Sequence, residues 1–272
     1  MHRRLVVSLV TAALCATTLT GAAGSASAAG SKTAGSKTAG SKTAGSRAAA
    51  SGSRAGSAAP TAAAAAVNCR KVKCVALTFD DGPVADTQRL LRILKDRNVK
   101  ATFYVVGNNV QRNPSTVRAE AQAGHQIGNH SWDHADLTKL SAAKVRSQFS
   151  RTDAAVKKAI GKNPTTVRAP YGANNATVRR AAGRPLVHWS IDTLDWKYRD
   201  SARIVRTVTA QTRPGDIVLL HDIHKTTVSA VPGIITALKA RGYHFVTVDQ
   251  LFAPARLPVG KVTYSNRAGY RP

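Results

Sequence analysis

The sequence predicts an α/β fold in which about seven parallel strands are covered by outer helices. Short apolar runs alternate strictly with helical patterns along the chain, and this alternation is typical of a parallel sheet with helices packed outside it. The segment from Val67 to Pro272 holds about 200 residues, a length that suits one domain with a sizeable core. From these patterns alone, the strands can close into a barrel or stay open.

The predicted strands are short apolar runs, at 75–79, 101–106, 125–128, 166–169, 186–189, 217–220 and 244–248. Helical patterns occupy the intervals, at 86–97, 114–123, 142–160, 176–182, 202–211 and 231–241. Pro114 and Ser115 resemble a helix start, because proline suits the first turn of a helix. Gly124, Gly161 and Gly242 follow predicted helices at the position where glycine commonly ends one.

Residues 1–28 have the pattern of a secretory signal peptide. Arg3 and Arg4 precede an apolar stretch that runs to about Leu19, and the tripeptide Ala-Ser-Ala at 26–28 fits a cleavage site. The apolar stretch is too short to span a membrane, and no later segment is long enough either. The residues after the arginine pair fit a twin-arginine export signal poorly. Cys15 lies too deep in the apolar stretch for a lipoprotein anchor. We therefore expect a secreted, extracellular protein.

Residues 29–66 are rich in glycine, serine, alanine, threonine and lysine, and the pentapeptide Gly-Ser-Lys-Thr-Ala occurs three times from Gly30. A segment with almost no branched or aromatic side chains cannot bury enough surface to offset the entropy of ordering. We therefore predict a disordered linker. The alternative interpretation is a basic arm that associates the protein with anionic polymers of the cell wall.

The chain is strongly basic, with 40 lysines and arginines against 14 acidic residues and a formal net charge of +26. Such a charge favours acidic surroundings. No run interleaves basic and aromatic residues as single-strand-binding proteins do, so nucleic acid is not the partner that we expect. An exported protein meets wall polyanions and acidic glycans first. The alternative is that the charge only keeps the protein soluble in a charged matrix.

Cys69 and Cys74 are the only cysteines after the signal peptide. In an oxidising compartment, a pair so close in sequence favours a small disulfide loop over two free thiols. Two thiolates alone do not make a metal site. The loop would lie just before the first predicted core strand.

Side chains with metal-binding chemistry follow two of the predicted strands. Asp80 and Asp81 end the first strand, and His130 and His134 follow the third. The carboxyl ends of parallel strands meet at one edge, so we expect these groups to lie together. Two imidazoles and the Asp81 carboxylate can hold a divalent ion and leave positions open for water, with the second carboxylate free as a base. Taken singly, Asp-Gly is a common turn pair and the histidine pair is ordinary surface polarity.

Arg168, at the end of the fourth predicted strand, is a candidate partner for Asp80, because a guanidinium would keep that carboxylate ionised and oriented. The turn through Pro170 and Tyr171 could present a backbone N–H to a developing oxyanion. The alternative is a surface arginine before a turn that proline bounds.

Asp192 and Asp195 lie in the segment Asp-Thr-Leu-Asp-Trp, where either carboxylate could orient a histidine or cap a helix, and Trp196 could wall a sugar groove. The alternative is an ordinary loop with an aromatic plug. His221 ends the sixth predicted strand after Leu219 and is a candidate general acid.

Five segments of the chain resemble, in order and context, the five motifs of the polysaccharide deacetylases, the NodB-homology enzymes of carbohydrate esterase family four. They are 78–82, 130–134, 168–171, 192–196 and 219–221. The resemblance covers essentially 75–252. It implies a distorted (β/α) barrel of about seven parallel strands with outer helices, with 67–253 as the catalytic domain and 254–272 as a C-terminal tail.

The resemblance also implies a division of roles. Asp80 would be the general base, tethered by Arg168, and His221 would be the general acid, held by Asp195. One divalent metal ion would be bound by Asp81, His130 and His134. The remaining motif residues would form the oxyanion hole and shape the acetyl pocket: Pro170, Tyr171, Trp196 and Leu219.

The metal expected first is zinc, although two histidines and a carboxylate also accept cobalt, nickel or manganese. The expected partners are acetylated cell-wall polysaccharides or oligosaccharides, namely peptidoglycan or chitin oligomers, from which N-acetyl groups would be hydrolysed. One alternative is an acetylxylan esterase, because the same groups would cleave an ester. The stretches at 73–77 and 221–231 look more like wall-directed members. A second alternative is a non-catalytic glycan-binding module, although degenerate members usually lose a ligand or the base. A third is a polyanion binder acting through charge alone.

Overall fold

The structure is a computed structural model that describes residues 67–267, 269–270 and 272. The predicted signal peptide and linker lie outside the described residues. Among the helices in the described part of the chain, none is long and apolar enough to cross a membrane.

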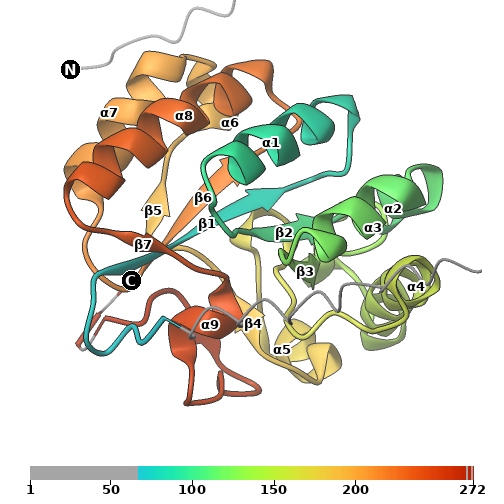
Figure 1. The fold of residues 1–272 in the computed structure, drawn as a ribbon. Helices are drawn as coiled ribbons and strands as arrows, with labels where there is room; N and C mark the ends of the chain where they lie inside the picture. The colour runs from blue at the N-terminus through green and yellow to red at the C-terminus, as the bar shows by residue number, and fades with distance from the viewer. Residues whose placement is uncertain (1–66, 268, 271) are drawn as a thin grey trace, which may run out of the picture. The chain divides into compact units, whose positions relative to one another are not determined.

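The core is a parallel sheet whose strands run in the order β5-β6-β1-β2-β3 (Figure 1). These strands are β5 (Ile191–Asp192), β6 (Asp216–His221), β1 (Cys74–Asp80), β2 (Thr102–Val105) and β3 (Gln126–Asn129). A further strand, β7 (His244–Phe245), pairs with the first residues of β1. The prediction of a parallel α/β sheet is confirmed.

The sheet extends beyond β3 but does not close. Bridges from Asn129 to Val167 and from Val167 to Leu186 lead to β4 (Leu186–Val187), which pairs with β8 (Val262–Thr263). Thus β4 and β5 follow one another along the chain but stand at opposite ends of the strand order. In the part of the chain that the structure describes, no ladder joins them, so the barrel is distorted and open.

Strand β1 places two polar side chains, Thr78 and Asp80, on the inner face of the sheet. All seven of its residues are buried, and side chains alternate between the two faces of a strand. Val75, Leu77 and Phe79 belong to the core cluster beneath the outer helices. Thr78 and Asp80 therefore lie on the opposite, inner face, at the carboxyl end of the strand.

The outer helices pack in the order α7, α8, α1, α3 and α4 around the strands (Figure 1). Their bounds are α7 Ser201–Gln211, α8 Lys225–Ala240, α1 Ala85–Asp96, α3 Pro114–Gln122 and α4 Ala142–Ile160. The shorter helices are α2 (Gly107–Arg112), α5 (Ala176–Ala182), α6 (Asp195–Tyr198) and α9 (Val248–Phe252), and there are 3₁₀ turns at Leu137–Lys139 and Pro170–Gly172.

Helices α4 and α5 have the bounds that the sequence predicts, because both ends of each carry signals. The Ser141 hydroxyl accepts a hydrogen bond from the Lys144 N–H at the start of α4, and Gly161 ends it in the left-handed conformation with φ 77°. Asn175 and Gly183 bound α5 in the same way.

Other boundaries differ from the predictions. Residues 166–169 contribute only a bridge at Val167, and the predicted strand at 244–248 ends at Phe245 because Thr247 and Gln250 form a capping box that starts α9. Helix α8 begins six residues earlier than predicted and contains Pro232 in its interior. Strands β5 and β8 and helices α2, α6 and α9 were not predicted. A disulfide joins Cys69 to Cys74, the first residue of β1.

Candidate functional site

A cavity of about 510 Å³ opens at the carboxyl ends of the strands. It gathers residues from segments far apart in the sequence. Its lining includes most of the candidate residues that the motifs supply: Asp80, Asp81, His130, His134, Tyr171, Asp192, Trp196, Leu219 and His221.

Asp81, His130 and His134 come together at this cavity, with their potential ligand atoms within 4.8 Å of one another. The Asp81 Oδ1 atom lies 3.4 Å from His130 Nε2 and 3.2 Å from His134 Nε2. Asp81 and His134 both adopt left-handed backbone conformations, with φ 74° and 62°. The strand-end turns, rather than helical spacing, thus aim these side chains at one point.

The donor set fits a divalent cation. His130 Nδ1 lies 2.8 Å from the carbonyl oxygen of Arg168, which can only accept, so Nδ1 carries the proton and Nε2 offers its lone pair. Asp81 Oδ1 is buried without a hydrogen-bond donor among the described residues. Burial raises the pKa of Asp81, but the adjacent His130 and His134 imidazoles outweigh it and hold that pKa well below its usual value. Burial and the charge of His130 lower the pKa of His134, which favours its neutral, ligating form.

Asp80 lies beside this cluster and is paired with Arg168. The fully buried Arg168 donates from Nη1 to Asp80 Oδ1 and to Thr78 Oγ1, each at 2.7 Å. Its other nitrogens donate to the carbonyl oxygens of Val187 at 3.0 Å and His188 at 2.8 Å. Each nitrogen of the buried guanidinium thus makes at least one hydrogen bond.

The second carboxylate oxygen of Asp80 faces the ligand cluster. It lies 3.6 Å from His130 Nε2, and the Asp80 side chain is 2% exposed. One oxygen is therefore held by Arg168 and the other is directed toward the place where the three candidate ligands converge.

His221 also lines the cavity, and its imidazole is hydrogen-bonded to the buried carboxylate of Asp195. Its Nδ1 lies 2.8 Å from Asp195 Oδ1, while Asp195 Oδ2 accepts from the His221 N–H at 2.8 Å and the Thr227 hydroxyl at 2.7 Å. Burial lowers the pKa of His221, but the bond and charge of Asp195 outweigh it and raise the pKa to about 9. At neutral pH, His221 is therefore an imidazolium that can donate its Nε2 proton.

The residue pattern alone leaves open which of two aspartates contacts the histidine, and the family resemblance implies Asp195. Asp192 Oδ1 accepts a hydrogen bond of 2.8 Å from the Leu194 N–H, so Asp192 shapes the turn before α6. The Asp195 carboxylate, rather than that of Asp192, is hydrogen-bonded to the His221 imidazole.

The walls of the cavity are aromatic and apolar. Tyr171 is 69% exposed and its ring meets the His134 ring edge-on at 4.6 Å between centroids. The Tyr171 backbone is left-handed, with φ 61°, after the buried Pro170. Trp196 is 47% exposed on α6, and Leu219 on β6 is buried at 3%.

Sequence reasoning missed several residues here. Trp189, Arg199 and Ile223 line the cavity, and Thr227 supports Asp195. Arg199 and Thr227 lie outside the five motif segments. Arg199 follows α6 and Thr227 lies in the first turn of α8, and the fold brings both to the site. Finding them would have required information about which residues far apart in the sequence are in contact.

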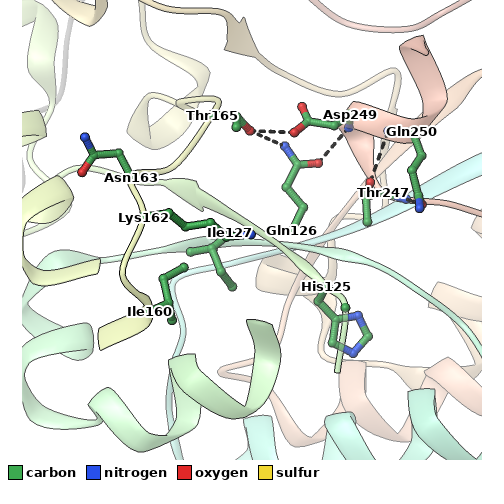
Figure 2. A pocket seen from close by; sticks show the side chains of 11 residues that line it. His125, Gln126, Ile127, Ile160, Lys162, Asn163, Thr165, Thr247, Asp249 and Gln250 are labelled. Atoms are coloured by element: carbon green, nitrogen blue, oxygen red, sulfur yellow. Dashed lines mark hydrogen bonds between the residues drawn. The ribbon is translucent and has the colours of Figure 1, made fainter. Parts of the chain in front are cut away.

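A second, smaller cavity of about 200 Å³ lies at the opposite ends of the strands (Figure 2). There Gln126 donates to Thr165 Oγ1 at 3.1 Å and accepts from the Asp249 N–H at 2.8 Å. His125 Nδ1 accepts from the Ala101 N–H at 3.1 Å, and burial together with Lys100 lowers the pKa of His125 to about 4. The bond between Gln126 and Asp249 joins β3 to α9. The candidate catalytic groups lie at the carboxyl ends of the strands, away from this cavity.

The family model described as "Polysaccharide deacetylase" matches residues 67–185. The chain is 48% identical over 190 residues to the peptidoglycan-N-acetylglucosamine deacetylase PgdA of Listeria monocytogenes, and the match covers 70% of this chain. The chain spans only 41% of the length of that relative.

Solved structures with the same fold are also similar in sequence. A structure described as "T48 deacetylase with substrate" matches with a TM-score of 0.71 and 46% identity, over 72% of this chain and 99% of that one. A family 4 acetyl xylan esterase from Clostridium thermocellum, in complex with a cobalt ion, matches with a TM-score of 0.68 and 34% identity, over 72% and 100% of the two chains.

Proposed function

This chain belongs to the polysaccharide deacetylase family, and from that premise we propose that it hydrolyses N-acetyl groups of amino-sugar polymers, with peptidoglycan as the leading substrate. One observation carries the proposal. A carboxylate oxygen of Asp80 lies beside the cluster of Asp81, His130 and His134, with the imidazolium of His221 in the same cavity. A base and an acid thus flank one set of metal ligands.

The metal ligands in this proposal are Asp81, His130 and His134. A divalent ion bound to them would polarise the acetyl carbonyl and make a water molecule more acidic. The two neutral imidazole nitrogens and one carboxylate oxygen suit zinc first, and cobalt, nickel and manganese also accept this set.

Asp80 is the general base. Its Oδ2 atom takes the proton of the attacking water, while Oδ1 stays in its hydrogen bond with Arg168. Because Arg168 is fixed by carbonyl oxygens and Thr78, it holds the Asp80 carboxylate in one orientation.

His221 is the general acid. An amine leaves poorly as an anion, so the nitrogen of the substrate has to receive a proton as the C–N bond breaks. Asp195 keeps the imidazole charged and directs Nε2 away from its own carboxylate. The products are acetate and a free amino sugar.

The substrate is positioned by the walls. The left-handed turn at Tyr171 supplies a backbone N–H for the developing oxyanion, as Pro170 fixes the start of the turn. The exposed Trp196 ring offers a face on which a sugar can stack, and Leu219 closes the base of the acetyl pocket.

The proposal is tested by acetate release from three substrates: purified peptidoglycan, chitin oligomers and acetylated xylan. We expect release from peptidoglycan with a matching loss of one acetyl mass per modified sugar. Release from xylan alone would assign an O-acetyl esterase instead. A chain that binds peptidoglycan but releases no acetate from any substrate would be a glycan-binding module.

We further propose that the enzyme is exported and acts at the cell wall. The basis is the sequence alone: the signal-peptide pattern at 1–28 and the basic repeats at 29–66. Fractionation of cells that express the full chain, with N-terminal sequencing of the extracellular form, tests export. Deletion of 29–66 tests retention on the wall, which should fall if the repeats bind wall polyanions.

A further inference from the structure

We propose that Arg199 makes the cavity select glycans that carry a carboxylate on the sugar next to the one that is deacetylated. This inference rests on the proposed deacetylase function and narrows its substrate to an anionic glycan, of the kind in which muramic acid alternates with N-acetylglucosamine. A neutral chitin-type chain would lack the recognised group.

Arg199 is built into the cavity by the turn that ends α6. It is the residue after Tyr198 and adopts a left-handed conformation, with φ 51°. Its side chain is exposed and lines the cavity that holds the metal ligands. Its Nε atom donates to the carbonyl oxygen of Trp196 at 2.8 Å, and its Nη1 atom contacts His224 Nδ1. These contacts fix the guanidinium beside Trp196.

The charge of Arg199 is not neutralised by the protein. Within the ranges that the structure describes, Arg199 forms no salt bridge. The carboxylates around the cavity are occupied otherwise. Asp80 pairs with Arg168, and Asp195 pairs with His221. The Asp192 carboxylate accepts from a backbone N–H.

A carboxylate on the substrate would match the remaining donors of Arg199. A guanidinium presents five N–H groups in a planar fork that suits a carboxylate with two parallel hydrogen bonds. One of these groups is used by Trp196 and one faces His224, so three are left for a ligand, one on Nη1 and two on Nη2. Trp196 and Ile223, which are 47% and 36% exposed, provide the apolar surface beside it for a sugar ring.

The test uses the zinc-loaded full chain and three glycans of matched length. The first is peptidoglycan strands freed of their stem peptides, so that the lactyl carboxylates are exposed. The second is the same strands after conversion of those carboxylates to methylamides, and the third is chitin oligomers. We expect kcat/KM about tenfold higher on the first than on the second, mainly through KM, and we expect added salt to reduce this preference.

The variants are Arg199→Gln, Arg199→Lys and the control Arg206→Gln, which removes the same charge from an exposed position on α7 outside the cavity lining. We expect Arg199→Gln to bring the ratio between the first two substrates close to one. Arg199→Lys should keep part of the preference, and Arg206→Gln should keep all of it.

Two results would overturn the inference alone. One is a wild-type chain that deacetylates carboxylate and methylamide strands equally well. The other is an Arg199→Gln variant that loses the same factor on all three glycans, because Arg199 would then only support α6 and His224. Absence of acetate release from every glycan would instead overturn the proposed function, and this inference with it.

Discussion

Arg168 and Asp80 form a buried ion pair of 2.7 Å between a fully buried guanidinium and a carboxylate that is 2% exposed. The pair joins the end of β1 to the segment that follows β3 in the sheet. Two charges of this kind are costly to bury, and they are stable here because carbonyl oxygens and a hydroxyl satisfy the arginine. The position of the proposed base thus depends on a residue that itself does not reach the cavity.

Removing Arg168 should destabilise the protein. Arg168→Met leaves the Asp80 carboxylate buried without its partner, and we expect a loss of about 3–5 kcal/mol in the free energy of unfolding. Urea unfolding measures it. The control Arg146→Met, on the exposed face of α4, should change stability by less than about 0.5 kcal/mol. Equal effects of the two variants would contradict the assigned role.

Replacing the proposed base should separate activity from metal binding. Asp80→Asn keeps the size of the side chain but removes its basicity, so kcat should fall by at least about 100-fold. Metal content, measured by elemental analysis after dialysis, should stay near that of the wild type, because the ligands are untouched. Near-native turnover in this variant would remove Asp80 from the role of base.

Replacing a proposed ligand should remove both properties together. His134→Ala and Asp81→Asn each take one donor from the cluster, so zinc affinity, measured by calorimetry, and acetate release should both be lost. Asp133→Asn is the matched control, because Asp133 is exposed and accepts a hydrogen bond only from Gln148 among the described residues. Retained zinc binding in both ligand variants would mean that the metal is held elsewhere.

The pH dependence of the reaction should report on His221. Its pKa is raised from 6.5 to about 9, so the acid form is present at neutral pH and kcat/KM should fall as the pH rises through about 9. Asp195→Asn removes the charge that holds the proton, so this alkaline limb should move to lower pH. Asp192→Asn should leave the limb in place, because Asp192 contacts a backbone N–H rather than the imidazole.

The same pair affects stability with a defined sign. The folded-state pKa of His221 lies above the ordinary value, so protonation favours the folded protein. The contribution is complete below about pH 6.5 and is lost as the pH rises toward about 9. Thermal unfolding across this range, compared between the wild type and Asp195→Asn, measures it. A wild-type curve that parallels the variant would show that the pair contributes nothing.

The sequence predicted most of what the strand ends bring together. Asp81, His130 and His134 could be grouped in advance because carboxyl ends of parallel strands share one edge. Helix α4 was predictable at both ends because Ser141 and Gly161 act within a few residues of the boundary. Such boundaries can be predicted from sequence because the residues that determine them lie next to the boundary.

What the sequence could not supply depends on distant contacts. β5 is only Ile191–Asp192 and exists because β6 lies beside it. Thr227 reaches Asp195 across a separation of 32 residues, and no local pattern marks that pair. Spacing alone did not distinguish Asp192 from Asp195; the family resemblance implied Asp195, and the structure places its carboxylate on the His221 imidazole.

The short strand β8 has a practical consequence for where this protein can be cut. The Thr263 carbonyl oxygen accepts from the His188 N–H at 2.7 Å, and the neighbouring His188 carbonyl oxygen accepts from Arg168 at 2.8 Å. Shortening the chain at residue 253, the predicted end of the catalytic domain, would remove β8 and with it the hydrogen bond to the segment that contacts Arg168. An expression boundary for a working domain therefore belongs beyond Arg267, whose guanidinium also pairs with Asp216 on β6.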